Sequence, residues 1–551
     1  MCGIVGIIST NKNKIRPELV EKALKVISHR GPDDIDIYTD DYISFGYVRL
    51  AIRGLDINHN QPIKFNSVIS FANGEVYSKD DTVIDPERND LEDLIKCILT
   101  DELGIYDRFD SDFAVCIYDK ETKTVVLSRD YYGVKPLFYT WLDKDTLLFS
   151  SEIKGLTVLL NNKYEYDNRS IMDYLLFGYP INNRTFYKNI YRLAPRTIFK
   201  WNLITNDKNT LSKELKYGYR SESISPADSL KRSVKKRLIS DRKVGAHLSG
   251  GYDSSLIAYY SKNTISYYTA YYDTNDRDYL FSKLISDELS LKTKYVHLSK
   301  KTDFKTLINI LDEPLMSTGA LVPYQIAQSA SNDSVRVLLA GQGADELFLG
   351  YSRFSDIKSI NSREELLEIL LNSDINMLYN LFGDLNIKQY TDLFVNDDYL
   401  KQAQYFYVNN FLSSLLHIED HVHMHFSIEN RVPYLGLDIV NFINRFGVNN
   451  NCYKKDIIKT HTEMKTAISF RNKKENMNCS VSGLLSKKEL YKVIELRVFE
   501  NLNYEQYKKY ADNIYHLTKR EQNTMWYIYN ISVWFSEKRF EGELSLETDY
   551  G

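Results

Sequence analysis

Short apolar runs separated by turn residues dominate the first 200 or so residues of the chain. Gly, Asp and Asn bound most of the runs, a pattern that is typical of β-strands joined by short turns. The runs occupy residues 4–8, 42–47, 68–71, 114–118, 125–127 and 147–149. Because helical stretches at 17–28 and 91–99 interrupt them, the pattern predicts a layered α+β domain instead of a pure β-barrel.

The second half of the chain has a different pattern. A helical stretch at 226–240 precedes a short apolar strand that ends in a glycine turn, at 244–251, and a further helix at 254–262. Strand, glycine loop and helix in this order form the repeating unit of a parallel α/β sheet. Further buried strands are expected at 265–272 and 335–340, and long helices after residue 360.

A polar segment near residues 203–226, rich in Asn, Lys and Ser, divides the two patterns. Such composition is typical of a connection between domains. We therefore expect a first domain over residues 1–205, a linker over 206–225, and a second domain over 226–551. The second domain is expected to combine a parallel α/β sheet with a helical C-terminal part.

The composition favours a folded enzyme. The 551 residues are 43% hydrophobic and 26% charged, and the net charge of -4 argues against a nucleic-acid-binding surface. The five cysteines contain no CxxC pair, which favours a reducing compartment over a disulfide framework. With neither a signal-peptide pattern at the start nor an apolar run of roughly 18 residues, we expect a cytoplasmic protein without a membrane span.

Cys2 is the first candidate for chemistry. Removal of Met1 would leave a cysteine whose own α-amino group lies within reach of its thiol. An α-amine has a pKa near ~8 and can accept the thiol proton, and the thiolate is the nucleophilic form. Taken alone, Cys2 could equally be a small buried residue at the start of a strand.

Further strings follow Cys2 in order. They are His-Arg-Gly-Pro-Asp-Asp at 29–34, Arg-Leu-Ala-Ile at 49–52, Phe-Ala-Asn-Gly-Glu-Val-Tyr at 71–77, Arg-Asp-Tyr-Tyr-Gly-Val-Lys-Pro at 129–136 and Ser-Glu-Ile-Lys at 151–154. Together they resemble the class II glutamine amidotransferases, which are N-terminal-nucleophile hydrolases, and in particular the asparagine synthetase family. The resemblance implies an αββα sandwich for the first domain.

The same resemblance implies a role for each matching residue. Cys2 would be the nucleophile, and Asn73 with the Gly74 amide would form the oxyanion hole, since two preorganised donors suit a tetrahedral oxyanion. Arg49 would bind the α-carboxylate of glutamine, for which a bidentate guanidinium is suited. The remaining glutamine-binding residues would be Ile52, Glu75 and Asp90, with the two carboxylates holding the substrate ammonium. Asn73-Gly74 also favours a type I′ hairpin turn, and both interpretations can hold.

A second constellation is the string Leu-Ser-Gly-Gly-Tyr-Asp-Ser-Ser at 248–255, between a predicted strand and a predicted helix. Glycines let backbone amides approach an anion, and a helix N-terminus adds a favourable dipole, so a pyrophosphate would fit there. The string resembles the ATP-pyrophosphatase loop. The ATP-binding residues implied are Leu248, Ser249, Gly250, Gly251, Asp253, Ser254, Ser255 and Gly341.

The string at 336–351, which contains Gly-Gln-Gly-Ala-Asp-Glu-Leu, resembles the asparagine synthetase signature. The resemblance implies Asp253 and Asp345 as ligands of Mg²⁺, an ion that prefers carboxylate and phosphate oxygens. It extends through Leu-Asp-Glu-Pro at 311–314 and Ser-Ile-Glu-Asn-Arg-Val-Pro at 427–433. Lys473 would be the cation that faces the phosphate in the transition state.

The second half departs from the family pattern at three positions. Gln342 stands where better-known asparagine synthetases have a carboxylate, Gly436 replaces an Asp, and His421 replaces an Arg. These departures concern the identity of the amide acceptor.

Four histidines lie within nine residues, and His417, His421 and His425 would share one helix face at i, i+4 and i+8, which could bind a transition metal. We favour the alternative, that these residues line a helix beside an anionic substrate.

The resemblance implies an ATP- and Mg²⁺-dependent ligase that takes ammonia from glutamine and amidates aspartate. One alternative is the same architecture acting on another carboxylate, such as a peptide, a sugar acid or an antibiotic precursor. A tRNA-modifying enzyme would need a basic surface and no Cys2, and a non-catalytic relative would not retain the motifs of both halves. We expect no nucleic-acid partner; a homodimer is typical of the family.

Overall fold

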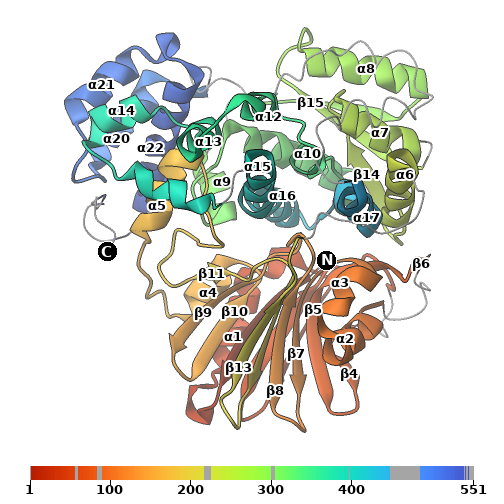
Figure 1. The fold of residues 1–551 in the computed structure, drawn as a ribbon. Helices are drawn as coiled ribbons and strands as arrows, with labels where there is room; N and C mark the ends of the chain where they lie inside the picture. Colours follow the sequence, from red (N-terminus) through yellow and green to blue (C-terminus); the bar gives the residue numbers. More distant parts are fainter. Residues whose placement is uncertain are drawn as a thin grey trace.

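The first half of the chain folds into two antiparallel sheets that pack face to face (Figure 1). A computed structural model describes residues 2–55, 60–83, 90–215, 225–262, 264–299, 304–395, 398–446, 484–538, 540, 544 and 546. The first sheet has the order β11 (Tyr191–Arg192), β9 (Phe138–Asp143), β10 (Thr146–Ser150), β1 (Cys2–Ser9), β3 (Ile43–Arg49) and β2 (Asp34–Thr39). The second has the order β13 (Lys208–Ser212), β12 (Thr197–Asn202), β8 (Thr124–Arg129), β7 (Phe109–Asp119), β5 (Val68–Lys79) and β4 (Ile63–Phe65), with β6 (Thr82–Val83) beside β5.

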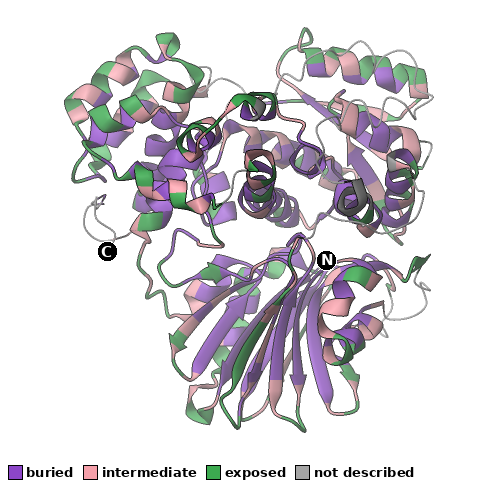
Figure 2. Cartoon of the chain, viewed as in Figure 1, coloured by how far each residue is buried: buried purple, intermediate pink, exposed green. Residues whose placement is uncertain are grey.

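Helices cover the outer face of each sheet. α1 (Pro17–Val26) and α4 (Ile153–Leu159) pack on the first sheet, and α2 (Asp90–Thr100) and α3 (Ile105–Arg108) lie against the second. Between the sheets, aromatic and aliphatic side chains interdigitate; the rings of Phe45 and Phe71 meet edge to face with centroids 4.8 Å apart. The predicted αββα sandwich is therefore confirmed, and central strands of the two sheets, such as β1 and β5, are largely buried (Figure 2).

One strand of the sandwich lies inside the range 206–225 that we expected to be a linker. β13 pairs antiparallel with β12, from Thr197↔Ser212 to Trp201↔Lys208. Most of its residues are exposed because β13 is an edge strand, so it lacks the apolar alternation of a buried strand. The polar composition concealed it.

The second half is built on a five-stranded parallel sheet. Its order is β16 (Thr293–His297), β15 (Ser266–Tyr271), β14 (Lys243–His247), β17 (Val335–Leu339) and β18 (Glu429–Arg431). α6 (Pro226–Arg237), α7 (Tyr252–Ser261), α8 (Arg277–Leu289), α9 (Phe304–Leu311), α10 (Leu321–Asn332) and the short α11 (Ala344–Leu347) accompany the sheet. β14 and β17 are neighbours, so the loops that follow them, at 248–251 and 340–343, lie at the same edge of the sheet.

The helical part follows, as the sequence predicts. It includes α13 (Arg363–Leu370), α14 (Ile375–Phe382), α15 (Tyr399–Phe406), α16 (Leu412–His425), α17 (Leu437–Phe446), α20 (Lys487–Leu496), α21 (Tyr504–Asp512) and α22 (Lys519–Glu537). α5 (Asn168–Phe177), from the first half of the sequence, leaves the sandwich and packs among these helices (Figure 1), where Tyr174 contacts Tyr527 at 4.8 Å between ring centroids. None of the described helices is both long and apolar enough to cross a bilayer.

Charged and polar side chains join the two halves. Arg237 of α6 donates from Nη2 to Asp110 of β7 at 3.0 Å, and the backbone N–H of Leu437 donates to the same carboxylate at 3.3 Å. The Ser427 hydroxyl donates to the carbonyl of His29 at 2.8 Å. The N-terminus marked in Figure 1 lies at this junction, so β1 begins next to the second half.

Candidate active sites

Cys2 lies at the first position of β1, opposite Arg49 in the antiparallel pair with β3. Its backbone N–H donates to Oδ1 of Asn73 at 2.9 Å, and the residue is only 6% exposed. Burial raises the pKa of the Cys2 thiol, although a backbone hydrogen bond from Leu50 and the charge of Arg49 act in the opposite direction. A neutral thiol in this position requires a base before it can attack a carbonyl.

Asn73 and Gly74 lie in the middle of β5, so the alternative of a hairpin turn at this dipeptide is wrong. β5 runs through both residues and pairs with β7, with Asn73 opposite Ala114 and Gly74 opposite Phe113. A Cβ at Gly74 would lie 2.6 Å from the carbonyl oxygen of Asp112, which explains why only glycine fits. The strand holds the Asn73 side chain fully buried, with no described hydrogen bond at Nδ2.

Arg49, which is expected to bind the α-carboxylate of glutamine, lies at the end of β3. Its guanidinium donates to Oδ1 of Asn60 and to the carbonyl of Gly54. These contacts orient the side chain near Cys2, since the two residues are paired across the strands.

The two carboxylates expected to bind an ammonium, Glu75 and Asp90, come together at Arg53. Nη1 of Arg53 lies 3.9 Å from Glu75 and 3.8 Å from Asp90. Asp90, in the first turn of α2, also accepts from the backbone N–H of Val76 at 2.8 Å. The sequence reasoning missed Arg53, although it directly follows the Arg-Leu-Ala-Ile string.

Burial and neighbouring charge change the acidity of both carboxyls. Burial, followed by the negative charge of Glu429, raises the pKa of Glu75 to about 7. Burial also raises the pKa of Asp90, against the positive charge of Arg53. Glu429 and Arg431 belong to β18, and Nη2 of Arg431 lies 3.8 Å from Glu75, so the second half contributes to the electrostatics around Glu75.

Ile52 lies at the contact between the halves. Its side chain belongs to a buried cluster with residues of the second half, such as Leu230 and Val234. Its carbonyl accepts from the backbone N–H of Asp241 at 3.0 Å. Its side chain therefore helps to hold the end of the Arg-Leu-Ala-Ile string against α6.

The predicted phosphate loop follows β14 and ends at α7. The Ser254 hydroxyl accepts from the backbone N–H of Ser249 at 3.1 Å, and the Ser255 hydroxyl donates to the carbonyl of Gly251 at 2.6 Å. Gly250 has φ +63°, and a Cβ there would lie 2.5 Å from the backbone nitrogen of Ser282. Leu248 is buried, with its carbonyl accepting from the Thr269 hydroxyl at 2.6 Å. The loop thus leads directly into the N-terminus of α7, where the helix dipole favours an anion.

The loop after β17 lies against this phosphate loop. A Cβ at Gly341 would lie 3.5 Å from Cβ of Asp253, and Gly343 adopts φ +89° before α11, which carries Asp345. Burial, followed by the charge of Asp253 and, more weakly, that of Asp345, raises the pKa of the Tyr434 hydroxyl. The charges of both carboxylates therefore reach Tyr434, and carboxylate oxygens are the kind of donor that a hard divalent cation prefers. Lys473 lies outside the described residues.

The three departures from the family pattern have different surroundings. Gln342 donates from Nε2 to Oε1 of Glu419, on α16, at 2.6 Å. A Cβ at Gly436 would approach the Ser233 hydroxyl and lie 2.8 Å from Nη1 of Arg237, so an Asp there would collide with α6. His421 lies beside Asp420 at the junction of the halves, with its Nδ1 3.4 Å from that carboxylate. Gln342 belongs to the loop at 340–343, which lies against the predicted phosphate loop.

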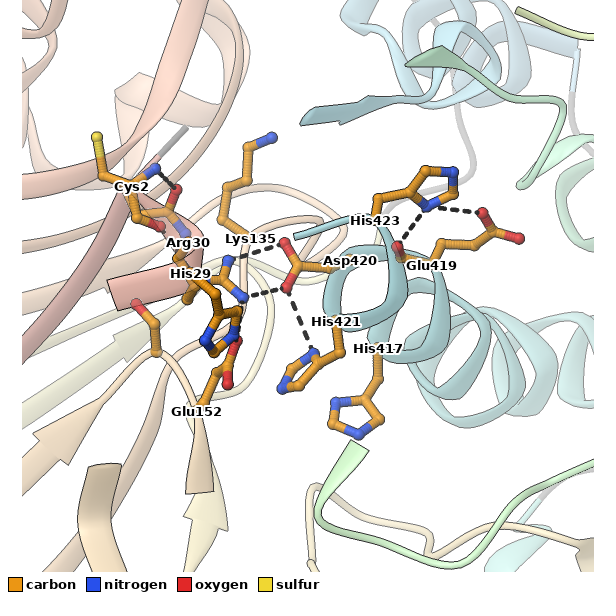
Figure 3. Close-up of polar contacts among 12 residues, drawn as sticks. Cys2, His29, Arg30, Lys135, Glu152, His417, Glu419, Asp420, His421 and His423 are labelled. Carbon is orange, nitrogen blue, oxygen red and sulfur yellow. Dashed lines mark hydrogen bonds and ion pairs between the residues drawn. The ribbon is translucent and has the colours of Figure 1, made fainter. Parts of the chain in front are cut away.

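A buried arginine connects the Cys2 region to the second half (Figure 3). Arg30 donates from Nε to the carbonyl of Cys2 at 3.2 Å and from Nη1 to Glu152 at 2.8 Å. It also forms a bidentate pair with Asp420 of α16, at 2.7 and 3.0 Å. Burial alone would raise the pKa of Asp420, but the charge of Arg30 and the hydrogen bonds to His421 and Arg30 together lower that pKa.

The clustered histidines of α16 do not act as one set. His417 hydrogen-bonds through Nε2 to the carbonyl of Leu311 at 3.1 Å, and His425 contacts the rings of His29 and Tyr324. His423, which the helical spacing left out, instead meets His247 with their Nε2 atoms 3.0 Å apart. Burial lowers the pKa of His247 to about 3 and that of His423 to about 4, and raises the pKa of Glu419 to about 8.

Comparison with known proteins assigns each half of the chain to a domain family. Residues 1–213 match the glutamine amidotransferase domain, and residues 226–455 match asparagine synthase. A Methanocaldococcus jannaschii protein, provisionally named glutamine-hydrolysing asparagine synthetase 2, is 31% identical over 401 residues, which cover 64% of this chain and 76% of the relative. Bacillus subtilis asparagine synthetase (glutamine-hydrolysing) 2 is 28% identical over 501 residues, covering 80% and 66%. Penicillium rubens amidase chyE is 26% identical over 384 residues, covering 61% and 55%.

An amidotransferase sandwich joined to a parallel-sheet synthetase half defines a class of enzyme. These are ATP-dependent ligases that form a carbon–nitrogen bond with glutamine as the amide donor. The chain belongs to the glutamine-hydrolysing asparagine synthetase family.

Proposed function

We propose that this protein is a glutamine-dependent asparagine synthetase. In the proposed cycle, the first half releases ammonia from glutamine, and the second half activates the side-chain carboxylate of aspartate with ATP and forms asparagine, AMP and pyrophosphate. The observation that carries the proposal is the Cys2–Asn73 contact, because it brings the candidate nucleophile and a buried amide donor together beside the junction with the synthetase half.

The proposed glutaminase chemistry begins after removal of Met1. The freed α-amine of Cys2 takes the thiol proton, and the thiolate attacks the side-chain amide of glutamine. The amide C–N bond then breaks, the amine returns the proton to the leaving ammonia, and water hydrolyses the resulting thioester to glutamate. Nδ2 of Asn73 and the N–H of Gly74 stabilise the oxyanion. Arg49 exchanges its contacts with Asn60 and Gly54 for the substrate carboxylate, and Glu75 and Asp90 bind the substrate ammonium, with Ile52 holding this segment in place.

The proposed synthetase chemistry uses the two loops at the edge of the parallel sheet. Backbone amides and hydroxyls of residues 248–255, together with Gly341, bind the phosphates of ATP. Asp253 and Asp345 are the carboxylates that would hold Mg²⁺, which neutralises phosphate charge when bound. Lys473 supplies a further cation. Activation as an acyl-adenylate is needed because a free carboxylate is a poor electrophile.

Ammonia must pass between the halves without meeting bulk water, and the burial of Arg30, Glu152 and Asp420 at the junction is consistent with such a path. A location in the cytoplasm, a homodimer, the domains 1–205 and 226–551 with a linker over 206–225, and the absence of a nucleic-acid partner stay predictions. The net charge of -4 is consistent with the last of these.

The main alternative is the same reaction on another carboxylate. Gln342, next to the ATP-site loops, is the departure that favours it, and a relative that bears the name amidase shows that the family's names are not uniform. His421 and Gly436 carry less weight, since they contact residues at the junction and on α6.

Product analysis tests the proposal. Purified protein receives glutamine, ATP, Mg²⁺ and one acceptor at a time: aspartate, glutamate, a sugar acid or a peptide carboxylate. Asparagine with equal amounts of AMP and pyrophosphate is the expected result, and Asp345→Asn should abolish all three while it still hydrolyses glutamine. Glutamate release with no asparagine, but with AMP formed from another acceptor, would exclude aspartate and support the alternative.

A further inference from the structure

Three metal-ligating side chains from two distant elements meet beside the phosphate loop. His247 is the last residue of β14, and Glu419 and His423 lie one turn apart on α16. One donor atom from each side chain lies within 4.8 Å of the others. Within the described ranges, no other group of three His, Cys, Asp or Glu residues has such spacing.

The ring of His423 is held in one tautomer. Its Nδ1 lies 2.6 Å from the carbonyl oxygen of Glu419, an atom that can only accept, so the proton is on Nδ1. The lone pair is then on Nε2, which faces Nε2 of His247 at 3.0 Å. Metal-binding histidines typically have their second nitrogen fixed by such a bond.

The Glu419 carboxylate is oriented on one side and lacks a hydrogen bond on the other. Gln342 donates to Oε1, while Oε2 makes no hydrogen bond within the described part of the chain and lies 3.4 Å from Nδ1 of His423. The residue is only 8% exposed, and a buried carboxylate oxygen is costly unless a proton or a cation compensates it.

We propose that His247, Glu419 and His423 bind a divalent transition-metal ion of the zinc class. Two imidazole nitrogens and one carboxylate oxygen suit this ion, and three protein ligands leave a coordination position for water or another ligand. The set differs from the all-oxygen pair Asp253 and Asp345, which suits Mg²⁺. The site stands on its own geometry and does not depend on the proposed function.

Such an ion would join α16 to both ATP-site loops. His247 directly precedes Leu248, and Gln342, which orients Glu419, lies in the loop that leads to Asp345. Glu419 and His423 point away from the side of α16 that carries Asp420 and His417 (Figure 3). The helix would thus be held by Arg30 on one side and by the metal on the other.

Metal titration tests the proposal without reference to activity. The full chain in a Cys2→Ala background is stripped with a chelator and titrated with Zn²⁺ against a chromogenic indicator, in excess Mg²⁺. One Zn²⁺ per chain is expected. Glu419→Gln, His247→Gln and His423→Gln should each weaken binding by on the order of 100-fold, and Gln342→Leu by about 10-fold. Co²⁺ should give the visible bands of a nitrogen and oxygen site.

Control variants come from the same helix. His417→Gln and His421→Gln should retain full affinity, and circular dichroism checks that every variant is folded. Should one ligand variant unfold, the isosteric Glu419→Gln and Gln342→Leu still decide the question. Absence of Zn²⁺ binding, equal binding in all the ligand variants, or thiolate charge-transfer absorption with Co²⁺ would overturn the proposal and leave a hydrogen-bonded cluster only.

Discussion

The glutamine site and the synthetase site differ in how far apart their residues lie along the chain. Cys2 and Arg49 come from adjacent strands of one sheet, Asn73 comes from the other sheet of the same sandwich, and Asp90 follows on α2. The second site combines the ends of β14 and β17 with α16, so that His247 meets a residue 176 positions away. The residues of the first site lie within the first 90 positions and in short strings, whereas the residues of the second site are brought together by the packing of α16 against the parallel sheet.

The halves nevertheless share charges at their junction. Glu75 of the glutamine pocket is influenced by Glu429 and Arg431 of the parallel sheet, and Arg30 joins the Cys2 carbonyl to Asp420. Variants of residues within one half should therefore separate glutamine hydrolysis from amide formation, whereas variants at the junction should disturb both.

The largest expected effect separates the halves. Cys2→Ala should lower glutamine-dependent amide formation by about 10⁴-fold or more, because the nucleophile is lost. Amide formation from added ammonia should continue at the wild-type rate, since the synthetase loops are untouched. Steady-state assays with each nitrogen source measure both values, and an equal loss with ammonia would contradict the separation.

The next largest effect is expected for the stability of the protein when the buried ion pair at the junction is broken. Arg30→Met removes the cation that pairs with the buried Asp420 carboxylate and should lower the free energy of unfolding by about 3–5 kcal/mol. Asp420→Asn should cost less, because Arg30 still pairs with Glu152. The double variant should lose less than the sum of the single variants. Urea unfolding measures the effect, with Lys188→Met as control, because the Lys188–Glu165 pair is exposed and should matter little. Additive losses would show that the pair is not coupled.

Removal of the Asn73 side-chain amide should lower glutamine hydrolysis and leave the ammonia-dependent reaction unchanged. Asn73→Ala should lower the kcat of glutamine hydrolysis by about 10²–10³-fold, as expected for the loss of one oxyanion donor. The ammonia-dependent rate serves as the internal control. If it falls to the same extent, Asn73 has a structural role instead.

Gly436 tests whether a departure from the family pattern concerns packing or acceptor choice. Gly436→Ala should lower the free energy of unfolding by about 1–3 kcal/mol, because the added methyl group meets Ser233 and Arg237. Gly341→Ala is the matched control for stability, since the added Cβ would lie 3.5 Å from the nearest atom, Cβ of Asp253. A changed acceptor preference with unchanged stability would contradict the packing explanation.

The smallest expected effect is a pH dependence. With the pKa of Glu75 raised to about 7, its carboxyl is charged above pH 7 and neutral below it. A neutral carboxyl binds the substrate ammonium poorly. The KM for glutamine should therefore rise several-fold from pH 8 to pH 6, as most of the Glu75 carboxyl groups become protonated. Glu75→Gln should have a raised KM across this range with no such step. A step retained in the variant would assign it to another group.

The fold could be predicted where apolar patterns are strong. Both sheets, the helix after the glycine loop and the helical C-terminal part follow from periodicity. The edge strand β13 could not be recognised because it is exposed, and the turn suggested by Asn73-Gly74 did not form because β7 pairs along the full length of β5. The packing of α5 among the C-terminal helices depends on contacts far apart in sequence.

By itself, the sequence determined the family, the order of the two halves and the residues of the local strings, since these depend on spacing within a few neighbouring residues. The tertiary structure alone decided that Arg53 joins Glu75 and Asp90, that Arg30 joins Cys2 to Asp420, and that His423, not the regularly spaced histidines, meets His247. The physical reason is that helical spacing fixes which residues share a face, whereas the packing of the helix against the sheet fixes what that face meets.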